Sequence, residues 1–303
     1  MRVFIVGATG YIGSHVVRRL VAAGHDVTGF ARNERGRAGL LQLGVVPHLG
    51  DIDDIGNLAR AALAADVTIF SAQLPSQDQE YETVDVLLRA YADTGRTFIF
   101  TSGSGVLGQR TDGDWSDDTF AEDDPFVPSK YILRRRETEL MVRAASRTGI
   151  RAMVIRPPMV WGAGYYGSVD RILASIERTG KACYIGRGLN LYTSVHVEDL
   201  ADLYALVIER GVAGALYHAS SGELNYRTIA ELVARQQGVE TRSVTPQDAV
   251  EIWDKLTMLI VLGVCSRTRS PRSRNELGWS PTRVDAFDQI LRGALNARTR
   301  AQL

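Results

Sequence analysis

The sequence predicts an α/β fold with a doubly wound parallel sheet, and two patterns support this prediction. Short β-branched runs alternate with longer stretches whose apolar residues recur at helical spacing. Such alternation builds a parallel sheet covered by helices on both faces, since crossovers between parallel strands are right-handed. The first apolar run also ends in a glycine-rich turn. The predicted strands are 2–6, 27–30, 45–48, 67–70, 97–100 and 152–155, and the predicted helices are 12–23, 56–64, 80–92 and 131–147.

The alternation loosens after Arg156. Segments 109–128 and 159–190 are rich in Gly, Asp and aromatic residues, and we expect them to form loops over the mouth of the sheet. A late strand at 216–218 and a helix at 227–237 follow, while 245–303 show no single pattern. The C-terminal half is therefore expected to form a smaller region beside the sheet.

Composition narrows the classes of function. The 303 residues carry 35 basic and 35 acidic side chains, so the net charge is zero, which disfavours nucleic-acid binding. Cys183 and Cys265 form no motif, and the histidines lack metal-ligand spacing, so no metal site is expected. No apolar run reaches the roughly 20 residues of a membrane span, and no signal-peptide pattern occurs. These features favour a cytoplasmic protein.

The strongest motif is GATGYIG at residues 7–13, between the first strand and the first helix. Its first glycine permits a tight turn, the second lets the backbone approach a pyrophosphate, and the third allows close helix–strand packing. The phosphates would lie at the positive end of the helix dipole. A plain strand–helix turn is the alternative, but the βαβ context favours a Rossmann-type dinucleotide site. The predicted contacts are Gly7, Thr9, Gly10, Tyr11, Ile12 and Gly13.

Basic residues follow the second predicted strand. An NAD site usually has a carboxylate here for the ribose 2′-hydroxyl, whereas Arg32 and Arg35 suit a 2′-phosphate. We therefore expect NADP, with NAD as the alternative; solvated loop charges are the other interpretation, and Glu34 opposes the basic trend. Asp51 and Ile52 would meet the adenine. The same site is expected to include Ser71, Ala72, Thr101 and Pro158.

Six motifs together resemble the short-chain dehydrogenase/reductase superfamily, in its extended or atypical branch of epimerase/dehydratase-like proteins. They are GATGYIG (7–13), GDI (50–52), TSGSGVLG (101–108), IRPPMVWG (155–162), SVHVEDLADLY (194–204) and NELGWSP (275–281). The resemblance implies a dinucleotide-binding domain at 1–158 and a mainly substrate-binding region at 159–303, with 189–220 returning to the Rossmann sheet. It gives Arg156, His196 and Asp199 structural rather than catalytic meaning.

The family uses a tyrosine acid/base, a lysine four residues later and a Ser/Thr donor. Here Tyr131 precedes Arg135 by four residues on one predicted helix, so arginine replaces lysine. The usual serine position falls on Gly103, flanked by Ser102 and Ser104. The resemblance thus implies Tyr131 as acid/base, Arg135 as its electrostatic partner, and Ser104 or Ser102 as the donor. The alternative is a solvated helix face.

The substrate prediction rests on a cluster of aromatic residues. Nucleotide-sugar enzymes of this branch carry an arginine before the His-Val-x-Asp segment, but residues 191–194 contain no basic residue. Concentrated aromatics suit a small hydrophobic or aromatic substrate, although ordinary core packing explains each one singly. The predicted substrate contacts are Met159, Trp161, Tyr165, Tyr166 and Tyr192.

These inferences predict an NADP(H)-dependent oxidoreductase that transfers hydride to or from a carbonyl or imine carbon. One alternative is an epimerase or dehydratase with tightly bound NAD. The other is a non-catalytic dinucleotide-binding redox sensor. The expected partner is a small molecule, and pairing of relatives through the tyrosine-bearing helix suggests a homodimer by analogy.

Overall fold

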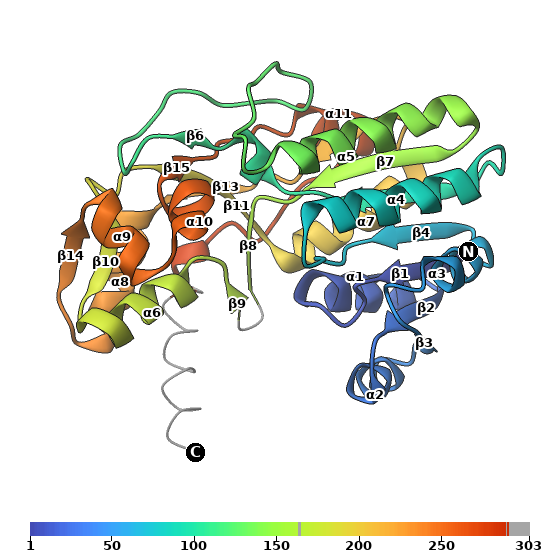
Figure 1. Cartoon of the computed structure of the whole chain (residues 1–303), viewed down its shortest axis with the longest axis horizontal. Helices are drawn as coiled ribbons and strands as arrows, with labels where there is room; N and C mark the ends of the chain where they lie inside the picture. The colour runs from blue at the N-terminus through green and yellow to red at the C-terminus, as the bar shows by residue number, and fades with distance from the viewer. Residues whose placement is uncertain (163–164, 289, 291–303) are drawn as a thin grey trace.

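The computed structural model describes residues 1–162, 165–288 and 290, and it confirms the predicted fold class. A seven-stranded parallel sheet has the strand order β12-β7-β5-β4-β1-β2-β3 (Figure 1). Because β1 lies inside the sheet and later strands are added on both sides of it, the order is doubly wound. The strands are β1 (Arg2–Val6), β2 (Asp26–Ala31), β3 (Val46–Leu49), β4 (Val67–Phe70), β5 (Thr97–Thr101), β7 (Arg151–Arg156) and β12 (Leu216–His218).

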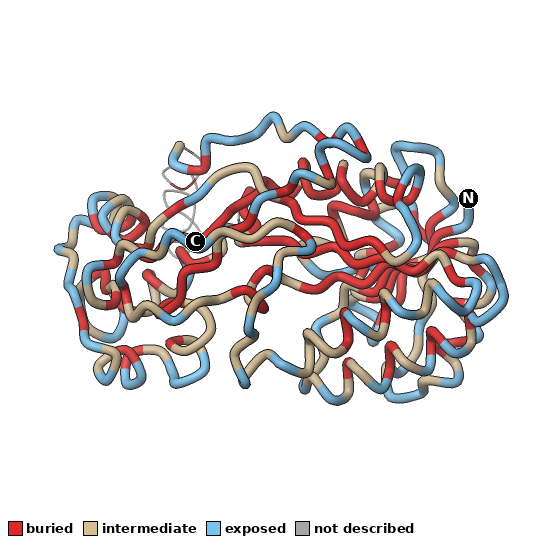
Figure 2. The backbone as a smooth tube through the Cα atoms, turned by 90° about the horizontal axis from the view of Figure 1, so that it is seen from above, coloured by how far each residue is buried: buried red, intermediate tan, exposed pale blue. Residues whose placement is uncertain are grey.

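Both faces of this sheet are buried, as Figure 2 shows by its buried central strands. Along β1, Val3 and Ile5 contribute to one hydrophobic cluster, whereas Phe4 and Val6 contribute to the cluster on the other face. This period of two explains why parallel strands appear in the sequence as continuous apolar runs. The first face is covered by α1 (Tyr11–Ala22) and α7 (Val197–Arg210), and the second by α3 (Ile55–Leu63), α4 (Gln77–Tyr91) and α5 (Leu133–Ala144).

The second part of the molecule has its own core and two small sheets. One sheet has the order β13-β11-β8-β9, and in the other β10 pairs with β14. The prediction of loops over 159–190 is wrong: the segment contains three short strands and a helix. The strands are too short to give a clear period in the sequence. The elements are β8 (Met159–Gly162), β9 (Tyr165–Tyr166), α6 (Val169–Thr179), β10 (Ala182–Ile185), β11 (Leu191–His196), β13 (Gly222–Asn225), α8 (Tyr226–Gln237), β14 (Thr241–Val244), α9 (Pro246–Ile252) and α10 (Lys255–Thr257).

Segment 189–220 divides between the two parts. Helix α7 packs against α1, and β12 pairs in parallel with β7, so these elements return to the large sheet. Strand β11 instead pairs with β8 and β13 in the second part. Segment 109–128 runs across the top of the molecule in Figure 1 and contains one short strand, β6 (Gln109–Arg110), paired with β15 (Val264–Cys265). Helix α11 (Pro271–Leu277) follows.

Two helices differ from the prediction in the large domain. Helix α2 (Glu34–Gln42) was not predicted, because Leu40 is its only buried residue and the sequence therefore lacks a helical apolar pattern. Helix α5 begins at Leu133 rather than at Tyr131. Its first turn is capped from outside, since the Gln77 side chain accepts from Arg135 N at 3.0 Å and donates to Tyr131 O at 2.7 Å.

Candidate functional site

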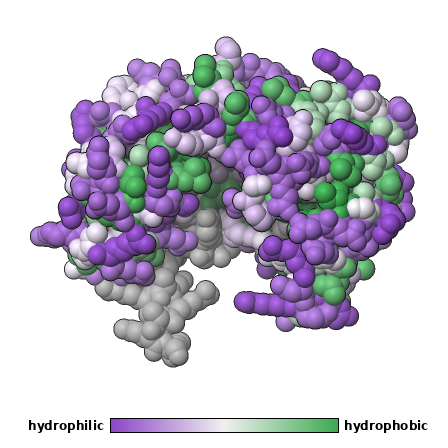
Figure 3. Space-filling model, in the orientation of Figure 1, coloured by the Kyte–Doolittle hydropathy of each residue, from purple (hydrophilic) through white to green (hydrophobic). Residues whose placement is uncertain are grey.

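A cavity of about 620 Å³ lies where the carboxyl ends of β1, β2 and β4 meet the second part of the chain. Figure 3 shows the surface hollowed between the two parts. This is the position at which open parallel sheets bind ligands. The lining residues described by the structure are Val6, Gly7, Thr9, Gly10, Tyr11, Ile12, Gly13, Phe30, Arg32, Ile52, Ser71, Ala72, Gln73, Leu74, Pro158, Met159, Val160, Gly167, Ser168, Arg171, Tyr192, Tyr226 and Val261.

The glycine turn forms the floor of this cavity, and its three glycines have different roles. Gly7 has a φ of +94°, where a side chain would be strained and would collide with Ser71 and Ala72. A Cβ on Gly13 would lie 2.0 Å from Gly7 O, so this glycine is required by packing. A Cβ on Gly10 would meet only Gly7 O, at 3.2 Å. Since Gly10 lines the cavity and no side chain caps α1, the turn fits a bound pyrophosphate.

Arg32 directly follows β2 and lies at the large-domain end of the cavity. It is exposed, lines the cavity and forms no ion pair within the described residues. Glu34, which opposed the basic trend in the sequence, forms an ion pair with Arg37 at 3.3 Å. Arg35 lies on the exposed part of α2 outside the cavity lining. Arg32 is thus the cavity's own positive charge at this end.

The other predicted cofactor contacts divide into two groups. Ile52, Ser71, Ala72 and Pro158 line the cavity. Asp51 does not, because its carboxylate accepts from Asp53 N at 3.0 Å beside the cavity.

Thr101 is also directed elsewhere. Its hydroxyl is 2.5 Å from the Tyr204 hydroxyl in the core, so it does not line the cavity.

The predicted catalytic pair is separated in the structure. Tyr131 lies in the turn before α5, so the expectation that it shares a helix face with Arg135 is wrong. Arg135 donates to the buried Glu80 on α4 at 2.6 Å, and this ion pair fixes α5 on α4. Its charge is therefore used by Glu80 rather than held beside Tyr131. Neither Tyr131 nor Arg135 lines the cavity.

The two serine candidates lie in different surroundings. Ser102 is buried near the Glu139 carboxylate and does not line the cavity. Ser104 is also buried, and its hydroxyl accepts from Ser266 Oγ at 3.2 Å. Burial raises the pKa of Tyr192, and the nearby Ser104 and Ser266 hydroxyls partly oppose that rise. Ser104 therefore contacts the cavity indirectly, through Tyr192, which lines it.

Three tyrosines line the cavity, and they differ in the use of their hydroxyls. Tyr11 donates to Gly162 O at 2.8 Å, and Tyr226 donates to Val261 O at 3.0 Å. Tyr192 has serine hydroxyls beside it instead of a backbone carbonyl. Tyr192 is thus the cavity tyrosine best placed to exchange a proton with a ligand.

The predicted substrate contacts are partly brought together. Met159 and Tyr192 line the cavity. Trp161 does not: it is 2% exposed and packs edge-on against His196, with ring centroids 4.7 Å apart. Tyr165 and Tyr166 pair through their backbones with β8, but their side chains lie outside the described part of the structure.

Several lining residues were not predicted from the sequence. Ser168 and Arg171 belong to the start of α6, in a segment that was predicted to be a loop. Tyr226 directly precedes the predicted helix 227–237, and Val261 lies in 245–303, where the sequence shows no single pattern. The amphipathic pattern of 169–179 was the available signal, because Val169, Ile172 and Ser175 are its buried face.

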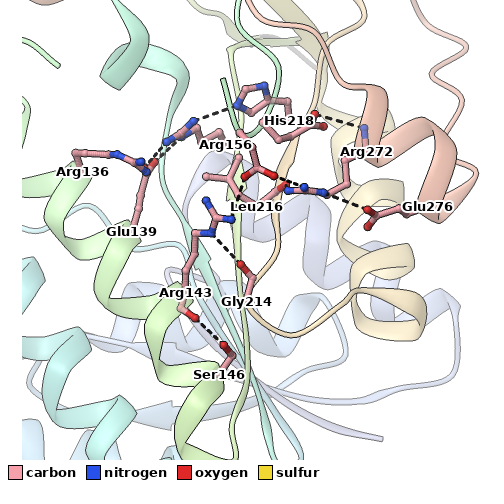
Figure 4. A network of polar contacts seen from close by, with 12 residues as sticks. Arg136, Glu139, Arg143, Ser146, Arg156, Gly214, Leu216, His218, Arg272 and Glu276 are labelled. Carbon is pink, nitrogen blue, oxygen red and sulfur yellow. Dashed lines mark hydrogen bonds and ion pairs between the residues drawn. The ribbon is translucent and has the colours of Figure 1, made fainter. Parts of the chain in front are cut away.

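The family's other motif residues have structural contacts. Arg156 is buried and forms an ion pair with Glu139 (Figure 4). His196 caps α7 by accepting from Glu198 N at 3.2 Å. The Asp199 carboxylate accepts from Arg283 N at 2.9 Å and thereby holds the chain after α11.

The described residues contain no cluster of three His, Cys, Asp or Glu side chains that could hold a metal ion. Within the same residues, no helix combines the length and apolar character needed to cross a membrane.

The chain matches a known protein family over more than half of its length. The model of the NAD dependent epimerase/dehydratase family matches residues 3–220, more than half of the chain. The chain belongs to this family. It is therefore an NAD(P)-dependent oxidoreductase of the short-chain dehydrogenase/reductase type.

Individual relatives agree with the family over most of the chain. An uncharacterised protein of Schizosaccharomyces pombe is 31% identical over 291 residues, covering 93% of this chain and 95% of that protein. A 4-hydroxy-2-methyl-3-oxo-4-farnesyl-3,4-dihydroquinoline-1-oxide ketoreductase of Stigmatella aurantiaca is 27% identical, covering 79% and 74%. The structure of DesIV, a dTDP-glucose 4,6-dehydratase from Streptomyces venezuelae with NAD and TYD bound, has a TM-score of 0.78 at 23% identity, covering 100% and 98%. This last likeness supports the fold alone.

Proposed function

We propose that this family member is an NADP(H)-dependent reductase or dehydrogenase acting on the carbonyl or imine carbon of a small, largely hydrophobic substrate. The observation that carries the cofactor preference is Arg32, which lines the adenosine end of the cavity without an ion-pair partner in the described residues. A 2′-phosphate would supply the negative counter-charge that the Arg32 guanidinium lacks. Glu34 does not oppose binding of this phosphate, because Glu34 is paired with Arg37.

The residues of the glycine turn would hold the cofactor. Gly7, Gly10 and Gly13 let its pyrophosphate reach the uncapped start of α1, and Ile52 would border the adenine. When bound, a nicotinamide dinucleotide supplies or accepts a hydride. The protein's part is to orient the reacting carbon and to move one proton to or from its oxygen or nitrogen.

The proton requires a hydroxyl at the substrate end of the cavity. Tyr131 is the candidate from family spacing, and Tyr192 is the candidate favoured by position, since it lines the cavity beside Ser104. The Tyr192 hydroxyl can donate to a developing alkoxide because of its position in the cavity wall, while burial raises its pKa and makes it a weaker acid than an ordinary tyrosine. Met159, Leu74 and Val261 supply apolar contacts for the rest of the substrate.

The relatives include a protein named a ketoreductase and one named a 2-alkyl-3-oxoalkanoate reductase, which supports reduction over the other reactions of the family. The test is oxidation of NADPH, followed by its absorbance, with a panel of aryl and alkyl ketones, aldehydes and imines. Turnover at catalytic enzyme concentration supports the proposal. NAD released only on denaturation, without net turnover, would instead indicate an epimerase or dehydratase. Cofactor binding without turnover would indicate a redox sensor.

A further inference from the structure

Arg171 is a positive charge in the cavity wall that neither the family assignment nor the cofactor explains. It is half-buried at the start of α6 and lines the cavity. Its position is fixed through its backbone, because Trp253 Nε1 donates to Arg171 O at 2.7 Å. Its guanidinium has no ion pair or hydrogen bond within the described residues.

The charged side chains that line the described part of the cavity are all positive. Among the cavity's described lining residues, Arg32 and Arg171 carry charge and no Asp or Glu is present. The two arginines come from different walls: Arg32 follows β2 in the large domain, and Arg171 belongs to α6 in the second part, on opposite sides of the molecule in Figure 1. Because Arg32 suits the adenosine end, Arg171 belongs to the substrate end.

The surroundings of Arg171 show what it would contact. Tyr192 and Tyr226 line the same cavity as Arg171, and its positive charge partly opposes the rise that burial causes in the pKa of both tyrosines. The pKa of Asp254 is lowered chiefly by its hydrogen bonds to Thr257, and Arg171 adds to this. However, Asp254 does not pair with Arg171: its carboxylate accepts from Thr257 N at 2.8 Å and from Thr257 Oγ1 at 2.6 Å.

We propose that the substrate carries an anionic group, a carboxylate in the simplest case, which binds the Arg171 guanidinium while the apolar remainder lies against Met159, Tyr192 and Tyr226. The inference rests on the proposed function and specifies its substrate class. A half-buried guanidinium without a partner is costly, and a carboxylate satisfies it with charge-assisted hydrogen bonds. The aromatic walls suit a ring or an alkyl chain.

The test compares each acid with its uncharged ester. Phenylglyoxylate and 2-oxo-4-phenylbutanoate, with their methyl esters, are titrated calorimetrically into the full chain saturated with NADP⁺. We expect the acids to bind at least about tenfold more tightly than the esters, since a hydrogen bond to a charged group contributes roughly 1.5–3 kcal/mol. In Arg171→Gln this preference should disappear, and in Arg171→Lys it should return in part.

Arg242→Gln is the matched control. Arg242 is an exposed arginine of β14 in the same part of the chain, outside the cavity lining, so its removal should leave the preference unchanged. Thermal unfolding of each variant reports whether folding is intact.

Four results would overturn the proposal: equal binding of acid and ester, a preference that survives in Arg171→Gln, no acid binding at about 10 mM, or a loss in Arg171→Gln of NADP⁺ affinity alone. Failure of the proposed function is separate, because it appears as absent NADP⁺ binding in the first titration. The acids and esters are then compared on the cofactor-free chain.

Discussion

Arg156 and Glu139 form a bidentate ion pair in the core, with Nε–Oε1 and Nη2–Oε2 distances of 2.7 and 2.5 Å. The pair joins β7 to α5, and Arg136 adds a third contact to Glu139 at 3.0 Å. Arg156 holds the pKa of the Glu139 carboxyl below its usual value although burial opposes this. The pair therefore fixes α5 on the end of β7.

Loss of the Arg156–Glu139 ion pair should lower the free energy of unfolding. Glu139→Gln leaves Arg156 buried without a counter-charge, and we expect the free energy of unfolding to fall by about 3 kcal/mol or more. Urea unfolding measures the change. Glu137→Gln on the same helix is the control, because the more exposed Glu137–Arg134 pair should contribute under ~1 kcal/mol. Equal effects of the two variants would contradict this role of Glu139.

His218 should make stability depend on pH. Burial, followed by the charge of Arg156, lowers the pKa of His218 to about 3. The unfolded chain binds a proton near pH 6.5 that the folded chain excludes, so stability falls as the pH drops below that value. Between pH 7.5 and pH 5 this residue alone should cost about 2 kcal/mol. We expect His218→Gln to reduce the difference between urea unfolding at the two pH values by that amount; an unchanged difference would contradict the prediction.

Alanine substitutions should distinguish the packing role of Gly13 from the phosphate-binding role of Gly10. In Gly13→Ala the Cβ would lie 2.0 Å from Gly7 O, so we expect a loss of stability of roughly 1–3 kcal/mol or more. In Gly10→Ala the nearest atom is 3.2 Å away, and the added methyl group lies in the path of the pyrophosphate. This variant should unfold near the wild-type temperature but bind NADPH at least about tenfold more weakly. Normal NADPH affinity in Gly10→Ala would show that the turn does not hold phosphates.

Phenylalanine substitutions should identify the proton donor once a substrate is found. Tyr192→Phe should lower kcat by about 10²-fold or more with little change in NADPH affinity, because it removes a positioned acid from the cavity. Tyr131→Phe should have a smaller effect, since Tyr131 does not line the cavity. A larger effect of Tyr131→Phe than of Tyr192→Phe would identify Tyr131 as the acid/base. It would also imply that the turn before α5 moves when ligands bind. Single-turnover rates at saturating NADPH make the comparison direct.

The sequence predicted the sheet and the glycine turn after its first strand well, because both depend on local patterns. The strand at Arg2–Val6 and the glycines after it are contiguous, so their geometry follows from neighbouring residues. The Tyr131–Arg135 relationship failed because a residue 58 positions before Arg135, Gln77, caps the helix and Glu80 takes the arginine's charge. Four-residue spacing places two side chains on one helix face only when both residues lie within the helix.

The cavity wall from the second part of the chain was predicted only in part, because Met159 and Tyr192 were expected there but Arg171 and Tyr226 were not. Arg171, Tyr192 and Tyr226 come from separate elements, α6, β11 and α8, and only the folded chain places them around one cavity. Trp161 is the kind of residue that often contacts ligands, but here it is buried and packs against His196. Aromatic content alone cannot distinguish these two situations.

The central claim is that Arg32 selects NADP(H), and the most direct measurement is the ratio of NADH to NADPH dissociation constants in wild type and in Arg32→Gln. We predict a wild-type ratio well above one that falls by about 10- to 100-fold in the variant, through weaker NADPH binding, because a charged hydrogen-bonded pair is lost. Arg35→Gln, outside the cavity lining, should change the ratio less. Tighter binding of NADH than NADPH by wild type, or an unchanged ratio in Arg32→Gln, would contradict the account.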